Sequence, residues 1–296
     1  MLCNAHRFRL SSSRCPPFSF IPRRLQPCLH VVLFSPCNFP IFAPEIIPVI
    51  TSQMPEKIFT LKSALYIVPT PIGNVDDITV RALKTLRAAD VLCCEDTRTT
   101  GQLLKIYGIE PRRLVSIHEH NEARQAAFIV AEIRAGRSVA LMSDAGTPLI
   151  SDPGARLVSA AISAEIDVVP LPGATAFAPA LAASGFGGGE FTFLGFPPHK
   201  KGRATFLKRV AEMDVAVILY ESPHRVAGLL AGLAEVCGGA RPVCVARELT
   251  KLHEEILRGT ASALAAHFTR IEPRGEFVVI VGAAGSLSAG FGNPEI

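Results

Sequence analysis

Short apolar runs alternate from residue 65 onward with segments whose apolar positions recur at helical spacing. The pattern favours Asp76 or Asp77 as the cap of the first helix. The runs are too short and too rich in β-branched residues for a helical bundle, so the pattern predicts an α/β fold. In the first half the predicted strands are 65–69, 91–94, 114–117, 138–142 and 167–171, and the predicted helices are 78–89, 101–107, 122–135, 154–164 and 174–183.

The alternation resumes after a cluster of glycines at Gly185 and 187–189. Few residue types tolerate the backbone freedom of such a cluster, which makes it the best domain boundary. We therefore expect two α/β domains of about five strands each, over residues 64–186 and 190–284, and a flexible tail over 285–296. The strands predicted in the second half are 191–196, 215–220, 242–246 and 276–281, and the helices are 203–213, 224–236 and 260–268.

The first 53 residues differ from the rest of the chain in composition. They carry four of the 8 Cys, and a proline recurs at every fourth position from Pro36 to Pro48. These prolines break any helix over the apolar run 29–50, so we reject a membrane span. They also disrupt the amphipathic helix that an organelle transit peptide needs. We expect residues 1–53 to be a disordered leader or the result of a start codon placed ahead of the true start at Met54, and we favour the latter.

Charge is distributed unevenly along the chain. Five of the 30 basic residues and one of the 26 acidic residues lie in residues 1–53, so the rest of the chain is neutral overall. A neutral body does not indicate nucleic-acid binding through its global field, and any polyanion contact must come from local clusters. Trp is absent and aromatic residues make up 7%, which argues against a platform that stacks single-stranded bases.

The cysteines do not indicate a metal site or disulfide bonds. No CxxC motif occurs, and Cys93 and Cys94 are adjacent on a predicted strand, where their side chains point to opposite faces. We therefore expect a reduced intracellular protein that binds no metal.

Four loops that follow predicted strands are rich in Gly, Pro, Asp and Ser or Thr. They are 69–74, 143–154, 170–175 and 220–225. Ligands of open α/β sheets bind beyond the carboxyl ends of the strands, and small residues let a ligand approach the backbone. One such loop is an ordinary turn in most proteins, but four together favour a binding site. The motifs GxGxxG, GxxxxGK[ST] and GxSxG are missing, which argues against a classical dinucleotide fold, a P-loop enzyme and a serine hydrolase.

Six strings occur in a fixed order along residues 64–284. They are LYIVPTPIGN (65–74), EDTR (95–98), HEHNE (118–122), SDAGTPLISDPG (143–154), YESPHR (220–225) and ARELTK (246–251). Together they resemble the bacterial ribosomal RNA small subunit methyltransferase I family of the tetrapyrrole-methylase superfamily, and the string 143–154 is specific to that family. The leader 1–53 has no counterpart in the family, and the C-terminal extension of many members is missing.

The resemblance implies a class III methyltransferase fold with S-adenosylmethionine in a cleft between two α/β domains. It implies methyl transfer to the ribose 2′-hydroxyl of a cytidine in the decoding region of small-subunit (16S) rRNA by a cytoplasmic homodimer, with no membrane or metal partner. By motif position, the residues expected at the cofactor are Pro71, Gly73, Ser143, Asp144, Ala145, Gly146, Thr175, Ala176, Tyr220 and Ala246.

A ribose hydroxyl is a very weak acid, so a general base or a charge-stabilising cation would assist the reaction. The candidates follow the predicted strands, and each could equally be an ion-pair partner or a helix cap. The sequence does not choose among them. They are Glu95, Asp96 and Arg98, then His118, His120 and Asn121, and in the second half Glu221 with Arg225 or Lys251.

RNA contact is expected at Lys200, Lys201 and Arg203, in a basic cluster that follows Pro197 and Pro198. Arg225 and Lys251 are further candidates, and Arg112–Arg113 is a weaker cluster. A solvated charged face is the alternative. Two other functions stay open: methylation of a tetrapyrrole or another small molecule by the same fold, and a non-catalytic RNA-binding module.

Overall fold

The computed structural model describes residues 59–118, 121–187 and 189–284. The predictions for the leader 1–53, for the tail 285–296 and for His120 lie outside these residues. The described residues belong to one unit of the chain, Glu56–Ile296.

Five parallel strands form the first sheet, in the order β3-β2-β4-β1-β5. Each strand is a short apolar run, as the sequence pattern predicts. Their bounds are β1 Leu65–Val68, β2 Val91–Cys94, β3 Leu114–Ser116, β4 Val139–Met142 and β5 Val168–Pro170.

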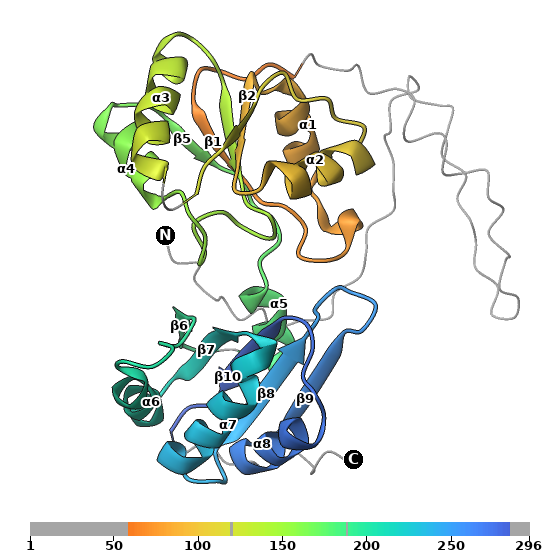
Figure 1. Cartoon of the computed structure of the whole chain (residues 1–296), viewed down its shortest axis with the longest axis vertical. Coiled ribbons are helices and arrows are strands. Elements are labelled where there is room, and N and C mark those ends of the chain that lie inside the picture. Colours follow the sequence, from red (N-terminus) through yellow and green to blue (C-terminus); the bar gives the residue numbers. More distant parts are fainter. Residues whose placement is uncertain (1–58, 119–120, 188, 285–296) are drawn as a thin grey trace, which may run out of the picture. The chain divides into compact units, whose positions relative to one another are not determined.

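Helices cover both faces of this sheet (Figure 1). On one face α1 (Val80–Ala88) and α2 (Thr97–Ile106) pack on Tyr66 and Val68, and on the other α3 (Glu122–Arg134) and α4 (Ala155–Ser163) pack on Leu65 and Ile67. Because side chains alternate along a strand, every residue of β1 is buried against one layer or the other. Cys93 and Cys94 point to opposite faces for the same reason, as predicted.

The neighbouring strands β1 and β4 form a topological switch point of the first sheet, where the connections leave for opposite faces. The chain leaves β1 for a helix on one face and leaves β4 for a helix on the other, although the two strands are neighbours. The loops that follow them therefore diverge and leave a crevice at the carboxyl edge of the sheet, where ligands of open α/β sheets bind.

The second sheet has the order β6-β7-β10-β8-β9 and is antiparallel except for the pair β6–β7. One face packs against α6 (Arg203–Glu212), α7 (Pro223–Cys237) and α8 (Ala261–Arg270), and the other packs against α5 (Phe177–Ser184). Its strands are β6 Phe191–Gly195, β7 Ala216–Glu221, β8 Pro242–Arg247, β9 Glu255–Thr260 and β10 Phe277–Val281.

Four details differ from the sequence analysis. Helix α2 was predicted over 101–107 and begins four residues earlier, at Thr97. Helix α1 is capped by Thr79, whose side chain accepts from the Ala82 amide, rather than by Asp76 or Asp77. Strand β9 was not predicted, because its residues do not form an apolar run. Helix α5 packs on the second sheet, ahead of the glycine cluster that we expected to separate the domains.

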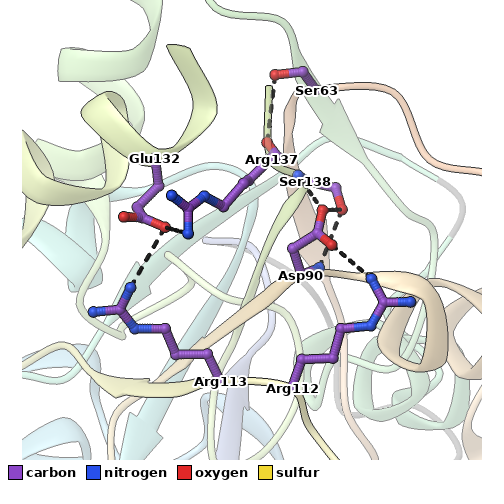
Figure 2. Close-up of polar contacts among 7 residues, drawn as sticks. All are labelled: Ser63, Asp90, Arg112, Arg113, Glu132, Arg137 and Ser138. Atoms are coloured by element: carbon purple, nitrogen blue, oxygen red, sulfur yellow. Dashed lines mark hydrogen bonds and ion pairs between the residues drawn. The ribbon is translucent and has the colours of Figure 1, made fainter. Parts of the chain in front are cut away.

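A polar cluster ties together the amino-terminal ends of the strands of the first sheet (Figure 2). Asp90, just before β2, accepts from the amide and the hydroxyl of Ser138, just before β4, at 2.9 and 2.8 Å. Arg112 pairs with Asp90 at 2.6 Å, and Arg113 pairs with Glu132 at 3.5 Å and stacks over a phenyl ring. The structure thus places Arg112 and Arg113, expected as a weak RNA-binding cluster, on carboxylates at the edge opposite the crevice.

We predict that Asp90→Ala destabilises the protein by about 2 kcal/mol at pH 7, because it leaves the buried Ser138 amide without its acceptor. Urea denaturation measures this. Hydrogen bonds from Ser138 lower the pKa of Asp90, so its contribution is lost as pH falls through that lowered pKa, and the two curves converge in acid. The control Arg112→Ala removes only an exposed partner and should cost less than about 1 kcal/mol. Equal losses for both variants would contradict this account.

Candidate functional site

A cavity of about 400 Å³ lies at the crevice and is lined by residues of both halves of the unit. The first half contributes the loops after β1, β4 and β5. The second half contributes the ends of β7, β8 and β10 and the loops beside them. The volume falls in the range of small-molecule sites, about 300–1,000 Å³.

Two loops of the crevice are joined by a backbone pair. The amide of Thr70 donates to the carbonyl of Gly146 at 2.9 Å, and the amide of Gly146 donates to the carbonyl of Thr70 at 3.0 Å. The Thr70 hydroxyl reaches across to the Ser143 carbonyl at 3.0 Å. Gly146 has φ +82°, a conformation that favours glycine, so its backbone can follow the cavity wall without a side chain.

Of the ten residues expected at the cofactor, seven line the cavity and three do not. Ser143 instead directs its hydroxyl to the Gly146 carbonyl at 3.0 Å and so shapes the loop. Pro71 is buried beside the cavity, and Gly73 packs against Thr250 and Lys251. The seven lining residues are Asp144, Ala145, Gly146, Thr175, Ala176, Tyr220 and Ala246.

Gly73 marks a close contact between the two halves. A Cβ atom there would lie 2.5 Å from Cγ of Lys251, and the neighbouring Asn74 amide donates to the Thr250 hydroxyl at 3.0 Å. Lys251 itself is bound by Glu248 at 2.8 Å and by Glu276 at 2.9 Å. The structure therefore places Lys251, a candidate RNA contact, in an ion-pair network beside the cavity.

Two of the candidate catalytic side chains have structural partners. Asp96 caps α2 by accepting from the Arg98 amide, and its carboxylate pairs with the Arg98 guanidinium at 2.9 Å. These bonds lower the pKa of Asp96 to about 2, which makes it a weak proton acceptor. The Asn121 amide group bridges the His118 amide and the Ser116 carbonyl, so it holds a turn. Neither side chain is free to act as a base.

Glu221, a third candidate, is fully buried between two arginines. Its carboxylate pairs with Arg225 at 2.7 Å and with Arg203 at 3.6 Å, and it accepts from the Ser222 amide. Both arginine side chains are only about one-fifth exposed. Arg203 and Arg225, expected as RNA contacts, therefore fix the end of β7 through Glu221, and Lys200 and Lys201 are the exposed members of the basic cluster.

The sequence analysis missed Asp152, although the residue lies within the string 143–154. Asp152 lines the cavity, and Ser143 is the polar neighbour that acts to lower its pKa. Burial and the charges of Glu95 and Asp144 raise the pKa of Asp152 to about 6. The pKa of Asp144 and that of Glu95 are also raised, in both cases mainly by burial. An Asp before Pro in a string already singled out was the available signal.

Phe196 is the second residue that the sequence analysis missed. It lines the cavity, is 52% exposed and lies edge-on to Tyr220 with ring centroids 5.6 Å apart. An exposed aromatic ring at a cavity edge is suited to contact a flat ligand group. It also links the cavity to the basic residues that follow it in the chain, Lys200 and Lys201.

Within residues 59–118, 121–187 and 189–284, no three His, Cys, Asp or Glu side chains are placed to hold a metal ion. In the same ranges, no helix has the length and apolar character that crossing a membrane requires.

We predict that Glu221→Ala lowers the free energy of unfolding by about 3 kcal/mol, because it leaves two largely buried guanidinium groups without their counter-ion. Urea denaturation at neutral pH measures the loss. The matched control Glu255→Ala removes a more exposed partner from Arg247 and should cost less than about 1 kcal/mol. Wild-type stability in Glu221→Ala would contradict the structural role.

Comparison with known proteins matches residues 64–265 to the Tetrapyrrole (Corrin/Porphyrin) Methylases. Two solved structures share the fold. The methyltransferase CobJ has a TM-score of 0.58 at 22% identity and covers 75% of this chain and 94% of its own. The cobalt precorrin-4 methyltransferase CbiF has a TM-score of 0.56 at 19% identity, covering 74% and 95%. These likenesses show the class III methyltransferase fold that the resemblance implied.

Curated relatives are much more similar in sequence. The ribosomal RNA small subunit methyltransferase I of Mesorhizobium japonicum is 50% identical over 226 residues, which is 76% of each chain. The protein of the same name from Escherichia coli O157:H7 is 47% identical, covering 73% of this chain and 77% of its own, and that from Thermotoga maritima is 43% identical, covering 73% and 97%. The chain therefore belongs to the ribosomal RNA small subunit methyltransferase I family of the tetrapyrrole methylases.

Proposed function

We propose that this protein transfers a methyl group from S-adenosylmethionine to rRNA of the small ribosomal subunit. The finer proposal is that the acceptor is the ribose 2′-hydroxyl of a cytidine in the decoding region of 16S rRNA. The observation that carries the proposal is the identity of 43–50% to relatives named ribosomal RNA small subunit methyltransferase I. The cavity supports it, because three of the six strings that carry the resemblance contribute more than one residue to its lining.

The cavity residues fit S-adenosylmethionine by size, shape and charge. Gly146 leaves a space that a Cβ atom would fill, 3.3 Å from Ile72 and 3.7 Å from the Ala174 carbonyl. Ile72, Leu249 and the Tyr220 ring give apolar surface for an adenine ring. Asp144 supplies negative charge in a half-buried setting, which suits the sulfonium and ammonium groups.

When bound, this cofactor supplies an electrophilic methyl group. The protein's part is to hold the acceptor oxygen in line with that methyl, which supplies much of the rate, and to exclude water. The joined loops at Thr70 and Gly146 give a rigid wall for this purpose. A proton must also leave the acceptor hydroxyl, and the half-buried carboxylates are the groups near the cavity that could receive it.

RNA contact is supported by the exposed residues beside the cavity. Phe196 presents an aromatic face at its edge, and a base turned out of its stack can lie on such a face. Lys200 and Lys201 are exposed and follow within the same loop, where they can meet phosphates. With Arg203 and Arg225 tied to Glu221, these two lysines carry the charge of the cluster.

The decisive experiment incubates the protein with small ribosomal subunits and radiolabelled S-adenosylmethionine and maps the label. Label on the 2′-oxygen of one cytidine of the decoding region would support the finer proposal. Label on another rRNA position would support methyl transfer to rRNA but contradict the finer proposal. Transfer to a tetrapyrrole but not to subunits would favour the small-molecule alternative. No transfer to either would favour the non-catalytic RNA-binding module. We further propose a homodimer in the cytoplasm, to be checked by light scattering and cell fractionation.

We predict that Gly146→Val abolishes binding of S-adenosylmethionine, measured by calorimetry, because a β-branched side chain at φ +82° enters the space between Ile72 and Ala174. The matched control is Gly136→Val. Gly136 also has a positive φ, +91°, but a Cβ atom there meets nothing within 4 Å and the residue does not line the cavity. The control should be destabilised yet bind the cofactor normally. Normal binding by Gly146→Val would place the cofactor elsewhere.

We predict that Lys200→Ala/Lys201→Ala flattens the slope of log affinity against log salt for small subunits by about 1.4–1.8, the share of two phosphate contacts. Filter binding over a salt series measures the slope. Cofactor affinity should not change, because neither lysine lines the cavity. The control Lys84→Ala/Lys105→Ala removes two exposed lysines from α1 and α2 and should keep the wild-type slope. An equal decrease of the slope in both variants would mean that RNA is bound by positive charge spread over the surface and not by Lys200 and Lys201 in particular.

A further inference from the structure

Four carboxylates line the cavity, and three of them are already bound by protein groups. Glu221 lies between two arginines, and Glu276 pairs with Lys251 at 2.9 Å. Asp144 accepts from the Asp96 amide at 3.3 Å. Asp152 differs, because the groups that act on it within the described chain are Ser143 and two other acids, and none of them is a cation. Asp152 is thus the carboxylate of the cavity that is poised to take up a proton.

The loop that carries Asp152 is held in an unusual conformation. Leu149 has φ +72°, Ser151 has φ +67° and Gly154 has φ +126°. Positive φ is costly for the two non-glycine residues, about 1 kcal/mol or more each, and persists where the surroundings impose it. Here it turns the chain so that Ile150, Ser151 and Asp152 all line the cavity.

The charged groups around Asp152 set its affinity for a proton. Glu95, after β2, and Asp144, after β4, raise its pKa, and burial contributes most. Tyr220, from β7, also senses the charge of Asp152. With a pKa of about 6, Asp152 is mostly ionised at neutral pH yet binds a proton far better than Asp96 does. A general base works best when its pKa is near the working pH.

We propose that Asp152 is the catalytic residue that accepts the proton of the substrate hydroxyl during methyl transfer. This inference rests on the proposed function. The hydroxyl oxygen forms a bond to the methyl carbon as the carbon–sulfur bond breaks. The electron pair of the carbon–sulfur bond stays on the sulfur. The O–H bond breaks and the proton passes to the Asp152 carboxylate, which yields a methyl ether, a neutral thioether and a protonated Asp152. Solvent then removes the proton from the acid.

The test compares Asp152→Asn with wild type in single-turnover methylation of small subunits at saturating cofactor. We expect the rate to fall at least 100-fold, while calorimetry shows cofactor affinity within about threefold of wild type. The wild-type rate should fall about tenfold per pH unit below pH 6 and level off above it, because only the ionised carboxylate accepts a proton. The variant should lack this dependence. The control Glu235→Gln, which changes an exposed carboxylate on α7, should keep the wild-type profile.

A second variant tests the same group without relying on activity. Glu95 raises the pKa of Asp152, so Glu95→Gln should shift the titration of the Asp152 carboxyl, followed by carbon-13 NMR in the absence of cofactor, to lower pH. The acid limb of the rate profile should move by the same amount. A limb that stays in place while the titration moves would overturn the assignment.

The remaining outcomes separate the inference from the proposed function. A wild-type rate in Asp152→Asn, or a loss of cofactor affinity with full activity at saturation, would overturn the role of Asp152 as base and leave the methyltransferase intact. Failure of the wild-type protein to methylate small subunits would overturn the proposed function and this inference together.

Discussion

The backbone pair between Thr70 and Gly146 is the constraint on which the site depends. Neighbouring parallel strands β1 and β4 send their chains to opposite faces of the sheet, and this would open a gap at their carboxyl ends. The two hydrogen bonds between Thr70 and Gly146 close the base of that gap and leave a cavity above it. The pair is made by main-chain atoms, so it does not depend on a particular side chain. It depends on the positive φ of Gly146, a conformation that favours glycine.

A second consequence is the separation of charge around the cavity. Positive side chains near it are bound to acids: Arg203 and Arg225 to Glu221, and Lys251 to Glu248 and Glu276. No cation of the described residues pairs with Asp152, and burial together with the charges of Glu95 and Asp144 raises its pKa. The cavity therefore presents negative charge, which suits a cationic methyl donor. The exposed positive charge lies outside it on Lys200 and Lys201, which suits a polyanion.

Hydrophobic periodicity predicted the strands of the first sheet within about one residue, because parallel strands covered on both faces must be continuous apolar runs. It failed for β9, in which Glu255 and Arg258 interrupt the pattern and Glu255 instead pairs with Arg247 across the hairpin. Such cross-strand ion pairs depend on register, which spacing along one chain does not reveal.

The site was predicted at the level of loops and less well at the level of side chains. Loops rich in Gly, Pro and Asp at the strand ends predicted the lining of the cavity, because these residue types indicate turns in the backbone that are recognisable from sequence. The choice among acids depended on distant partners. Glu221 and Arg203 are 18 positions apart in the chain yet form an ion pair, and Asp144 and Asp96 meet over 48. Only the fold shows that Asp96 is a helix cap and that, among the described residues, no cation lies beside Asp152.

Departures from ordinary local structure coincide with the cavity. Within the described chain, five residues other than glycine have positive φ, and four of these lie in two loops beside the cavity: Leu149, Ser151, Glu248 and Thr250. Each costs free energy that the rest of the fold must offset, and so does burial of Asp152 among other acids. Elsewhere in the described chain, Glu165 is the one other non-glycine residue with positive φ. Strain and unpaired charge that persist together at one place are difficult to explain as packing, and a function at that place explains both.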